Sequence, residues 1–95
     1  GGREGSDLIS FGLMDYRTTA HAEKVIAERD ISRRWIEETL SSPERTEDQE
    51  DGTVHFLRRI VDRDGRALRV ITTAGSRPIL IVTAFFDRRI KDLSQ

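Results

Sequence analysis

The chain has 95 residues, enough for one two-layer core and too few for a second. Its 16 lysine and arginine residues face 17 aspartate and glutamate residues, so a net charge of −1 excludes a strong overall basic field. Cysteine is absent, which excludes disulfides and thiolate metal sites. No apolar run is long enough to span a membrane, so we expect a cytoplasmic protein.

The chain order predicts one folded unit with two short ends. We expect residues 1–15 to form an N-terminal arm, residues 16–90 a single α+β domain, and residues 91–95 a C-terminal tail.

Two short amphipathic helices are predicted in the first half of the domain. The first begins after Thr18 or Thr19, whose hydroxyl can cap the free amides, and it ends near Arg29. The second begins after Ser32 and ends near Ser41, shortly before a proline that cannot continue a helix.

The second half of the domain is typical of strands. Residues 53–62, 66–74 and 79–87 are rich in Val, Ile, Thr and Phe, and residues 45–47 can form a short edge strand. One sheet face must be buried against the helices. The order of the predicted helices and strands along the chain therefore predicts two N-terminal helices packed on one face of a three- to four-stranded antiparallel meander sheet.

The turn between the first two long strands sets their register. If Asp64-Gly65 is a two-residue hairpin turn, Ile60 pairs with Arg69. One face of the sheet then carries Phe56, Arg58, Arg69 and Thr73. The other face carries His55, Leu57, Arg59, Leu68 and Val70.

The last predicted strand is apolar on both faces. Residues 79–86 read Ile-Leu-Ile-Val-Thr-Ala-Phe-Phe. An edge strand of this kind invites pairing with a second copy of the chain, or coverage by the N-terminal arm. A homodimer is therefore one expectation.

The first helix carries two residues that can do chemistry. Ideal helical geometry places His21 and Arg29 near one face, with Val25 between them. The helix dipole disfavours a charged imidazole at His21, and a neutral imidazole can act as a general base. The alternative is a histidine bonded to a backbone carbonyl. Arg29 lies within the apolar stripe, so a carboxylate, a carbonyl or an anionic ligand must meet it.

Arginine dominates the cations of this chain, because Lys24 and Lys91 are the only lysines. Arg69 stands alone in a strand otherwise suited to burial, and together with neighbouring arginines it predicts a site for an anion. The alternative is an open sheet face of solvated arginines paired with carboxylates. The acidic run 47–51 is interpreted as a solvated loop, which could also neutralise the arginines.

Five segments of the chain resemble one family: Thr19-Ala-His21-Ala, Glu28-Arg29-Asp-Ile31-Ser32, residues 51–59, Leu68-Arg69-Val70-Ile71 and Val82-Thr83-Ala-Phe85-Phe86. They cover about residues 16–89 and are similar to the small bacterial domain of unknown function 4258. That family is similar in layout to the RelE and barnase-like ribonuclease fold group. One departure is Val25, at a position where the family pattern has an arginine.

The resemblance implies a RelE-like, metal-independent endoribonuclease or toxin-type domain, in which a ribose 2′-hydroxyl attacks the adjacent phosphate. Histidine would transfer a proton and arginines would stabilise the charged phosphorane. The catalytic residues implied in this way are His21, Arg29 and Arg69, and the RNA- or anion-binding residues are His55, Phe56, Arg58 and Arg59. No cofactor or metal is expected. An antitoxin or another acidic protein would cover the arginine face.

A second hypothesis comes from a different class. The same arginine face would suit a non-catalytic binding module for an acidic protein partner or a nucleic acid.

Overall fold

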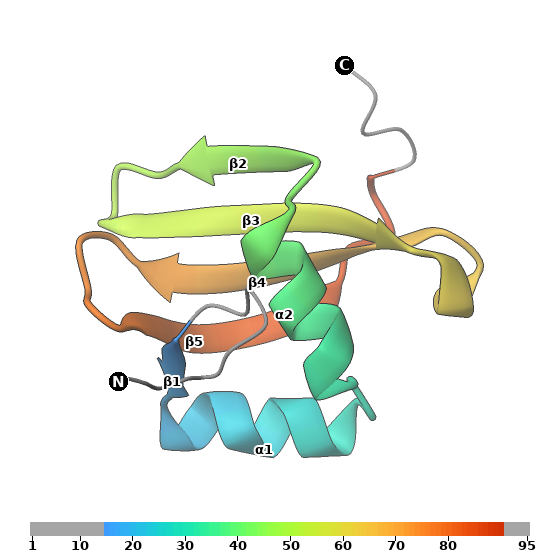
Figure 1. Cartoon of the computed structure of the whole chain (residues 1–95), viewed down its shortest axis with the longest axis horizontal. Helices are drawn as coiled ribbons and strands as arrows, with labels where there is room; N and C mark the ends of the chain where they lie inside the picture. The colour runs from blue at the N-terminus through green and yellow to red at the C-terminus, as the bar shows by residue number, and fades with distance from the viewer. Residues whose placement is uncertain (1–14, 91–95) are drawn as a thin grey trace, which may run out of the picture.

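The computed structural model describes residues 15–90, so the predicted tail and the predicted arm other than Asp15 lie outside the described residues. These residues form an α+β domain whose five-stranded sheet has the order β1-β5-β4-β3-β2 (Figure 1). The elements are β1 (Tyr16–Thr18), α1 (Ala20–Glu28), α2 (Arg33–Ser41), β2 (Arg45–Asp48), β3 (Thr53–Ile60), β4 (Arg66–Thr73) and β5 (Ile79–Phe86).

Both predicted helices are confirmed, together with their caps. The Thr19 hydroxyl accepts a hydrogen bond from the Ala22 amide at 3.0 Å, and the Ser32 hydroxyl accepts one from the Arg34 amide at 3.2 Å. These bonds satisfy amides that the first turn of a helix leaves free. The α+β class is confirmed because both helices precede the long antiparallel strands.

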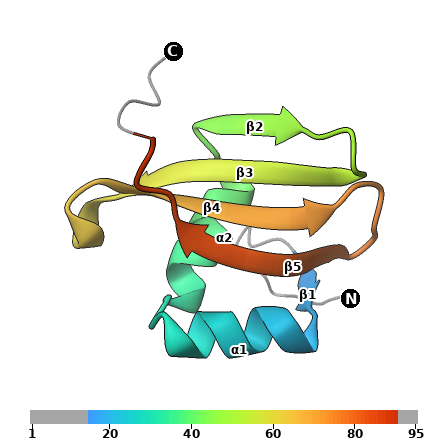
Figure 2. The same cartoon turned by 180° about the vertical axis from the view of Figure 1, so that it is seen from behind.

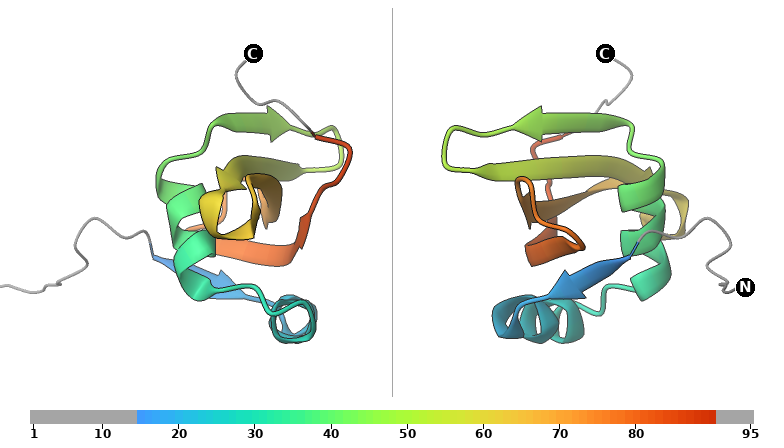
Figure 3. Two further views of the ribbon diagram at one scale, coloured as in Figure 1. Left: turned by 90° about the vertical axis from the view of Figure 1, so that its right-hand side faces the viewer. Right: turned by 60° about the vertical axis from the view of Figure 1, so that its left-hand side comes forward.

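The core lies between the helices and one face of the sheet. Helix α2 packs across β3 and β4, and α1 runs along β5 and contacts β1 (Figure 3). The most buried side chains of this helix-side core are Ala22, Ile36, Leu68, Val70, Ile81 and Ala84. Burial of these apolar side chains is the main term that stabilises the fold.

The opposite face of the sheet, here called the open face, is covered by neither helix (Figure 2). Among residues 15–90, the buried hydrophobic cluster of this face consists of Leu57 and Ala67, and Ile90 packs against it from the segment that follows β5. Two charged residues next to this cluster, Arg69 and Asp87, are buried as well.

The sheet has more strands than predicted, and it is mixed. Residues 16–18 form β1, which pairs in parallel with residues 79–81 of β5. Strand β5 was expected to pair with a second copy or to be covered by the N-terminal arm, and it is instead covered by residues 16–18, which directly follow the predicted arm. Beyond β1, the Thr19 amide donates to the Ile81 carbonyl at 3.0 Å, and Arg29 Nη1 donates to the Ala84 carbonyl at 3.0 Å. These bonds satisfy carbonyls of β5 that an edge strand would expose.

The predicted register of β3 and β4 was also wrong. A 3₁₀ turn at Val61–Arg63 lengthens the connection, and Asp64 (φ 58°) and Gly65 (φ 74°) follow it in left-handed conformations. Ile60 consequently pairs with Arg66, three residues short of the predicted Arg69. Because an odd shift exchanges the faces of a strand, Arg69 lies on the open face. It shares that face with His55, Leu57 and Arg59, whereas Phe56 and Arg58 face the helices.

Candidate functional site

Arg69 lies at the centre of the open face, in the middle of β4, and is only 7% exposed. Its Nε donates to Asp87 Oδ2 at 2.9 Å and its Nη1 donates to Glu47 Oε1 at 3.0 Å. The same Nη1 lies 2.8 Å from Nδ1 of His55. We call Glu47, His55, Arg69 and Asp87 the open-face cluster.

The contact with Arg69 defines the tautomer of His55. A guanidinium only donates hydrogen bonds, so Nδ1 of His55 must accept and carries no proton. The imidazole is therefore neutral, and its proton is on Nε2. Within residues 15–90, Nη2 of Arg69 donates no hydrogen bond to the protein, although the side chain is only 9% exposed.

Sheet pairing brings the cluster together from four separate segments. Glu47 of β2 is the pairing partner of His55 in β3, and Leu57, two residues further along β3, is the pairing partner of Arg69. Side chains two residues apart in a strand share a face, so Glu47, His55 and Arg69 all lie on the open face. Asp87 directly follows β5, and its amide donates to the Ala67 carbonyl at 2.8 Å, which holds its carboxylate beside Arg69.

Charge and burial shift the pKa of Asp87 in opposite directions. Hydrogen bonds from the side chain and amide of Arg89, and then from Arg69, lower the pKa of Asp87 to about 2 despite its burial. Asp87 is therefore a buried carboxylate, fully ionised at neutral pH, that accepts bonds from two guanidinium groups.

Burial lowers the pKa of His55, and the nearby charge of Arg69 lowers it further. Both effects penalise the imidazolium form. They agree with the neutral tautomer that the hydrogen bond requires.

The lowered pKa of Asp87 predicts that the folded protein loses stability in acid. Its pKa is lower in the folded protein than in the unfolded chain, so the unfolded chain binds the proton first as the pH falls. The stabilisation is present above about pH 4, near the ordinary pKa of aspartate, and is lost as the pH falls toward 2. We expect the free energy of unfolding, measured by urea titration, to fall more steeply over this interval in the wild type than in Asp87→Asn. Glu50→Gln, which changes an exposed carboxylate, is the matched control. Equal slopes in Asp87→Asn and the wild type would contradict the assignment.

The structure places two of the residues predicted from the sequence, Arg69 and His55, in contact. Arg59 is on the same face, where its Nη2 donates to Glu44 Oε2 at 2.7 Å. Phe56 and Arg58 lie on the other face: Phe56 packs against the helix-side core, and Arg58 Nη1 donates to the Ser42 carbonyl at 2.8 Å.

His21 and Arg29 do not join this cluster. His21 is exposed on α1, and Arg29 makes its bond to the Ala84 carbonyl, one of the partners that the sequence left open for it. Strand β5 lies between α1 and β4, which separates both residues from Arg69. The catalytic roles implied for His21 and Arg29 stay predictions.

Sequence reasoning missed the two carboxylates of the cluster. Glu47 was assigned to a solvated acidic run. The expectation that this run could neutralise arginines was the only sequence evidence for its contact with Arg69. Asp87 was placed at the end of a strand and given no role. A buried arginine needs a hydrogen-bond acceptor or an anion, but only the pairing of the strands selects which group supplies it.

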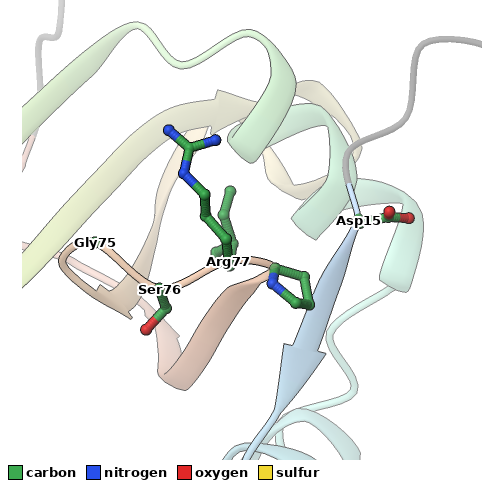
Figure 4. Close-up of a pocket in the computed structure, with 6 residues that line it drawn as sticks. Asp15, Gly75, Ser76 and Arg77 are labelled. Carbon is green, nitrogen blue, oxygen red and sulfur yellow. The ribbon is translucent and has the colours of Figure 1, made fainter.

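A cavity of about 580 Å³ lies elsewhere, at the turn between β4 and β5. It is lined by Asp15, Gly75, Ser76, Arg77, Pro78 and Ile79. The side chains of Arg77 and Asp15 point in different directions there (Figure 4). No member of the open-face cluster lines this cavity, so the two sites are separate.

Two other functional features are absent from the described part of the chain. Residues 15–90 contain no group of three or more His, Cys, Asp or Glu side chains arranged to hold a metal ion. No helix among these residues has both the length and the apolar character needed to cross a bilayer.

Comparison with known proteins identifies a family. Residues 18–86 match the model of a domain of unknown function, DUF4258. Neither a curated protein nor a solved structure matches the chain.

Proposed function

Because the chain belongs to the family of domains of unknown function DUF4258, whose description states no activity, we propose a function from the geometry of the open-face cluster. The proposed function is metal-independent cleavage of RNA, with the scissile phosphate bound at Arg69. In this proposal the domain is RelE-like in layout and toxin-type in role, and an acidic antitoxin would cover the open face.

One observation carries the proposal. A nearly buried guanidinium lies on an uncovered sheet face, with a carboxylate 3.0 Å and an imidazole 2.8 Å from the same nitrogen. A base, an acid and a cation placed around one point are the groups that phosphodiester cleavage requires.

The proposed reaction uses each of these groups once. Glu47 takes the proton of the ribose 2′-hydroxyl, and the 2′-oxygen bonds to phosphorus. The bond from phosphorus to the 5′-oxygen breaks, and protonated His55 supplies a proton to that leaving oxygen. Arg69 stabilises the charge on the phosphorane through its Nη2 hydrogens. The products are a 2′,3′-cyclic phosphate and a free 5′-hydroxyl.

Protonation of His55 prepares the site. An imidazolium cannot accept the hydrogen bond from Arg69, so protonation of Nδ1 releases Nη1 toward the phosphate. Because burial and the charge of Arg69 lower the pKa of His55, this form becomes abundant only at a pH below the range that is ordinary for histidine. Cleavage should accordingly be faster in mild acid than at neutral pH.

The direct test is cleavage of a fluorescent single-stranded RNA by the purified protein, with a chelator present, between pH 5 and pH 8. We expect fragments that end in a 2′,3′-cyclic phosphate. An RNA with a 2′-deoxyribose at the cleaved position should stay intact there, because it lacks the attacking hydroxyl. Continued cleavage of the deoxy position, or no cleavage at any pH in this range, would refute the proposal.

A second candidate function is a non-catalytic binding module. The observation that favours it is that Glu47 and Asp87 already neutralise Arg69, which argues against a role for this guanidinium in stabilising a phosphorane. A binding module would leave RNA intact yet retain RNA or an acidic peptide. Induced expression separates the two, because a ribonuclease slows growth and His55→Ala, which leaves the buried Arg69–Asp87 ion pair in place, relieves the effect, whereas a binding module is harmless.

A further inference from the structure

Phe85 is the cross-strand neighbour of Arg69 on the open face. The two residues are paired between β5 and β4, and side chains paired in this way point to the same side of a sheet. Adjacent strands are about 4.8 Å apart. Phe85 therefore emerges on the open face next to the residue whose guanidinium binds the scissile phosphate in the proposed reaction.

Phe85 differs from the other aromatic side chains within residues 15–90. Tyr16, Trp35, Phe56 and Phe86 all pack against the helix-side core, and Trp35 and Phe86 contact each other edge to face at 6.0 Å. Phe85 packs against neither hydrophobic cluster and is half-buried. The stability of the core therefore does not account for an aromatic ring at this position.

We propose that Phe85 is a platform on which one RNA base stacks while its phosphate is bound at Arg69. This inference rests on the proposed function and specifies its substrate as single-stranded RNA, since a base in a duplex has no free face to offer. Every base has a π-face, so the contact favours unpaired RNA with little preference among the four bases. It replaces the RNA-binding role that the family resemblance implied for Phe56, whose ring lies on the other side of the sheet.

The experiment measures binding rather than cleavage. The probe is a short fluorescent single-stranded RNA with a 2′-deoxyribose at the cleaved position, and fluorescence anisotropy gives its affinity for the wild type, Phe85→Ala and Phe85→Trp. The control is Leu80→Ala, a half-buried apolar residue on the same strand that has no pairing contact with Arg69. Circular dichroism checks that each variant is folded.

We expect Phe85→Ala to weaken binding about tenfold, as for one lost base–aromatic stack, and Phe85→Trp to retain it. Leu80→Ala should change the affinity less than about twofold. An abasic site moved along the RNA should weaken wild-type binding about tenfold at one position. At that position the abasic site should not weaken binding to Phe85→Ala further, because this variant has already lost the stack between the base and the ring.

The outcomes separate this inference from the proposed function. If the wild type binds the RNA but the abasic effect is unchanged in Phe85→Ala, stacking on Phe85 is wrong and the proposed function stands. Equal losses in Phe85→Ala and Leu80→Ala would lead to the same conclusion. A wild type that binds no single-stranded RNA would overturn both.

Discussion

Replacing Arg69 with alanine is expected to lower the free energy of unfolding by about 3–5 kcal/mol, the usual cost of removing one partner from a buried ion pair. The side chains of Arg69 and Asp87 are 9% and 2% exposed, and the substitution leaves the Asp87 carboxylate without its buried partner. Glu47 loses the same cation. The cost is the desolvation of charges that no longer have an interior partner.

Arg89→Ala is the matched control for this prediction. Arg89 binds the same carboxylate at 3.1 Å, but its side chain is 81% exposed. Ion pairs with an exposed partner contribute about 0–1 kcal/mol, so the control should lose far less stability. Urea unfolding of both variants at neutral pH measures the difference. If Arg69→Ala costs no more than Arg89→Ala, the buried pair does not stabilise the fold as described.

His55→Ala and Glu47→Gln are each expected to slow RNA cleavage by about 10²- to 10⁴-fold, the range for loss of a general acid or base. The wild-type rate should rise as the pH falls below neutral, because the imidazolium form of His55 is the proton donor. His55→Ala should lose this rise. The measurement is the initial cleavage rate of the fluorescent RNA across the pH range.

Two further variants make this result decisive. Glu50→Gln removes an exposed carboxylate from the loop beyond β2 and should leave the rate unchanged. His21→Ala separates the site implied by the family resemblance from the open-face cluster. A large loss of activity in His21→Ala with none in His55→Ala would place the chemistry on α1 and contradict the mechanism proposed above.

Glu47 also contributes to the fold through its bond to Arg69, so rates must be compared in variants that remain folded. A Glu47→Gln protein that unfolds like the wild type but cleaves slowly would support a chemical role. A protein that loses stability and activity together would show only that Glu47 positions Arg69.

The site was partly predictable because one part of it obeys a local rule. An arginine that stands alone in a strand otherwise suited to burial predicts a nearby anion or carboxylate, and this rule singled out Arg69. The rule does not name the acceptor. Glu47 and Asp87 are 22 and 18 residues away from Arg69 along the chain, and their positions depend on how three other segments pair.

The register error had a specific physical cause. An Asp-Gly pair is common in two-residue turns, but here Asp64 and Gly65 close a longer connection that begins with a 3₁₀ turn. The three-residue difference moved Arg69 and His55 onto the same face, although the predicted register had placed them on opposite faces. One turn therefore decided which residues could form a site.

By itself the sequence determined the two helices, their capping residues Thr19 and Ser32, and the three long strands, because each depends on contacts a few residues apart. Only the tertiary structure decided the addition of β1 to β5, the register of β3 on β4, and the grouping of Glu47, His55 and Asp87 around Arg69. These features depend on pairing between distant segments, in which a shift of a single residue exchanges the two faces of a strand.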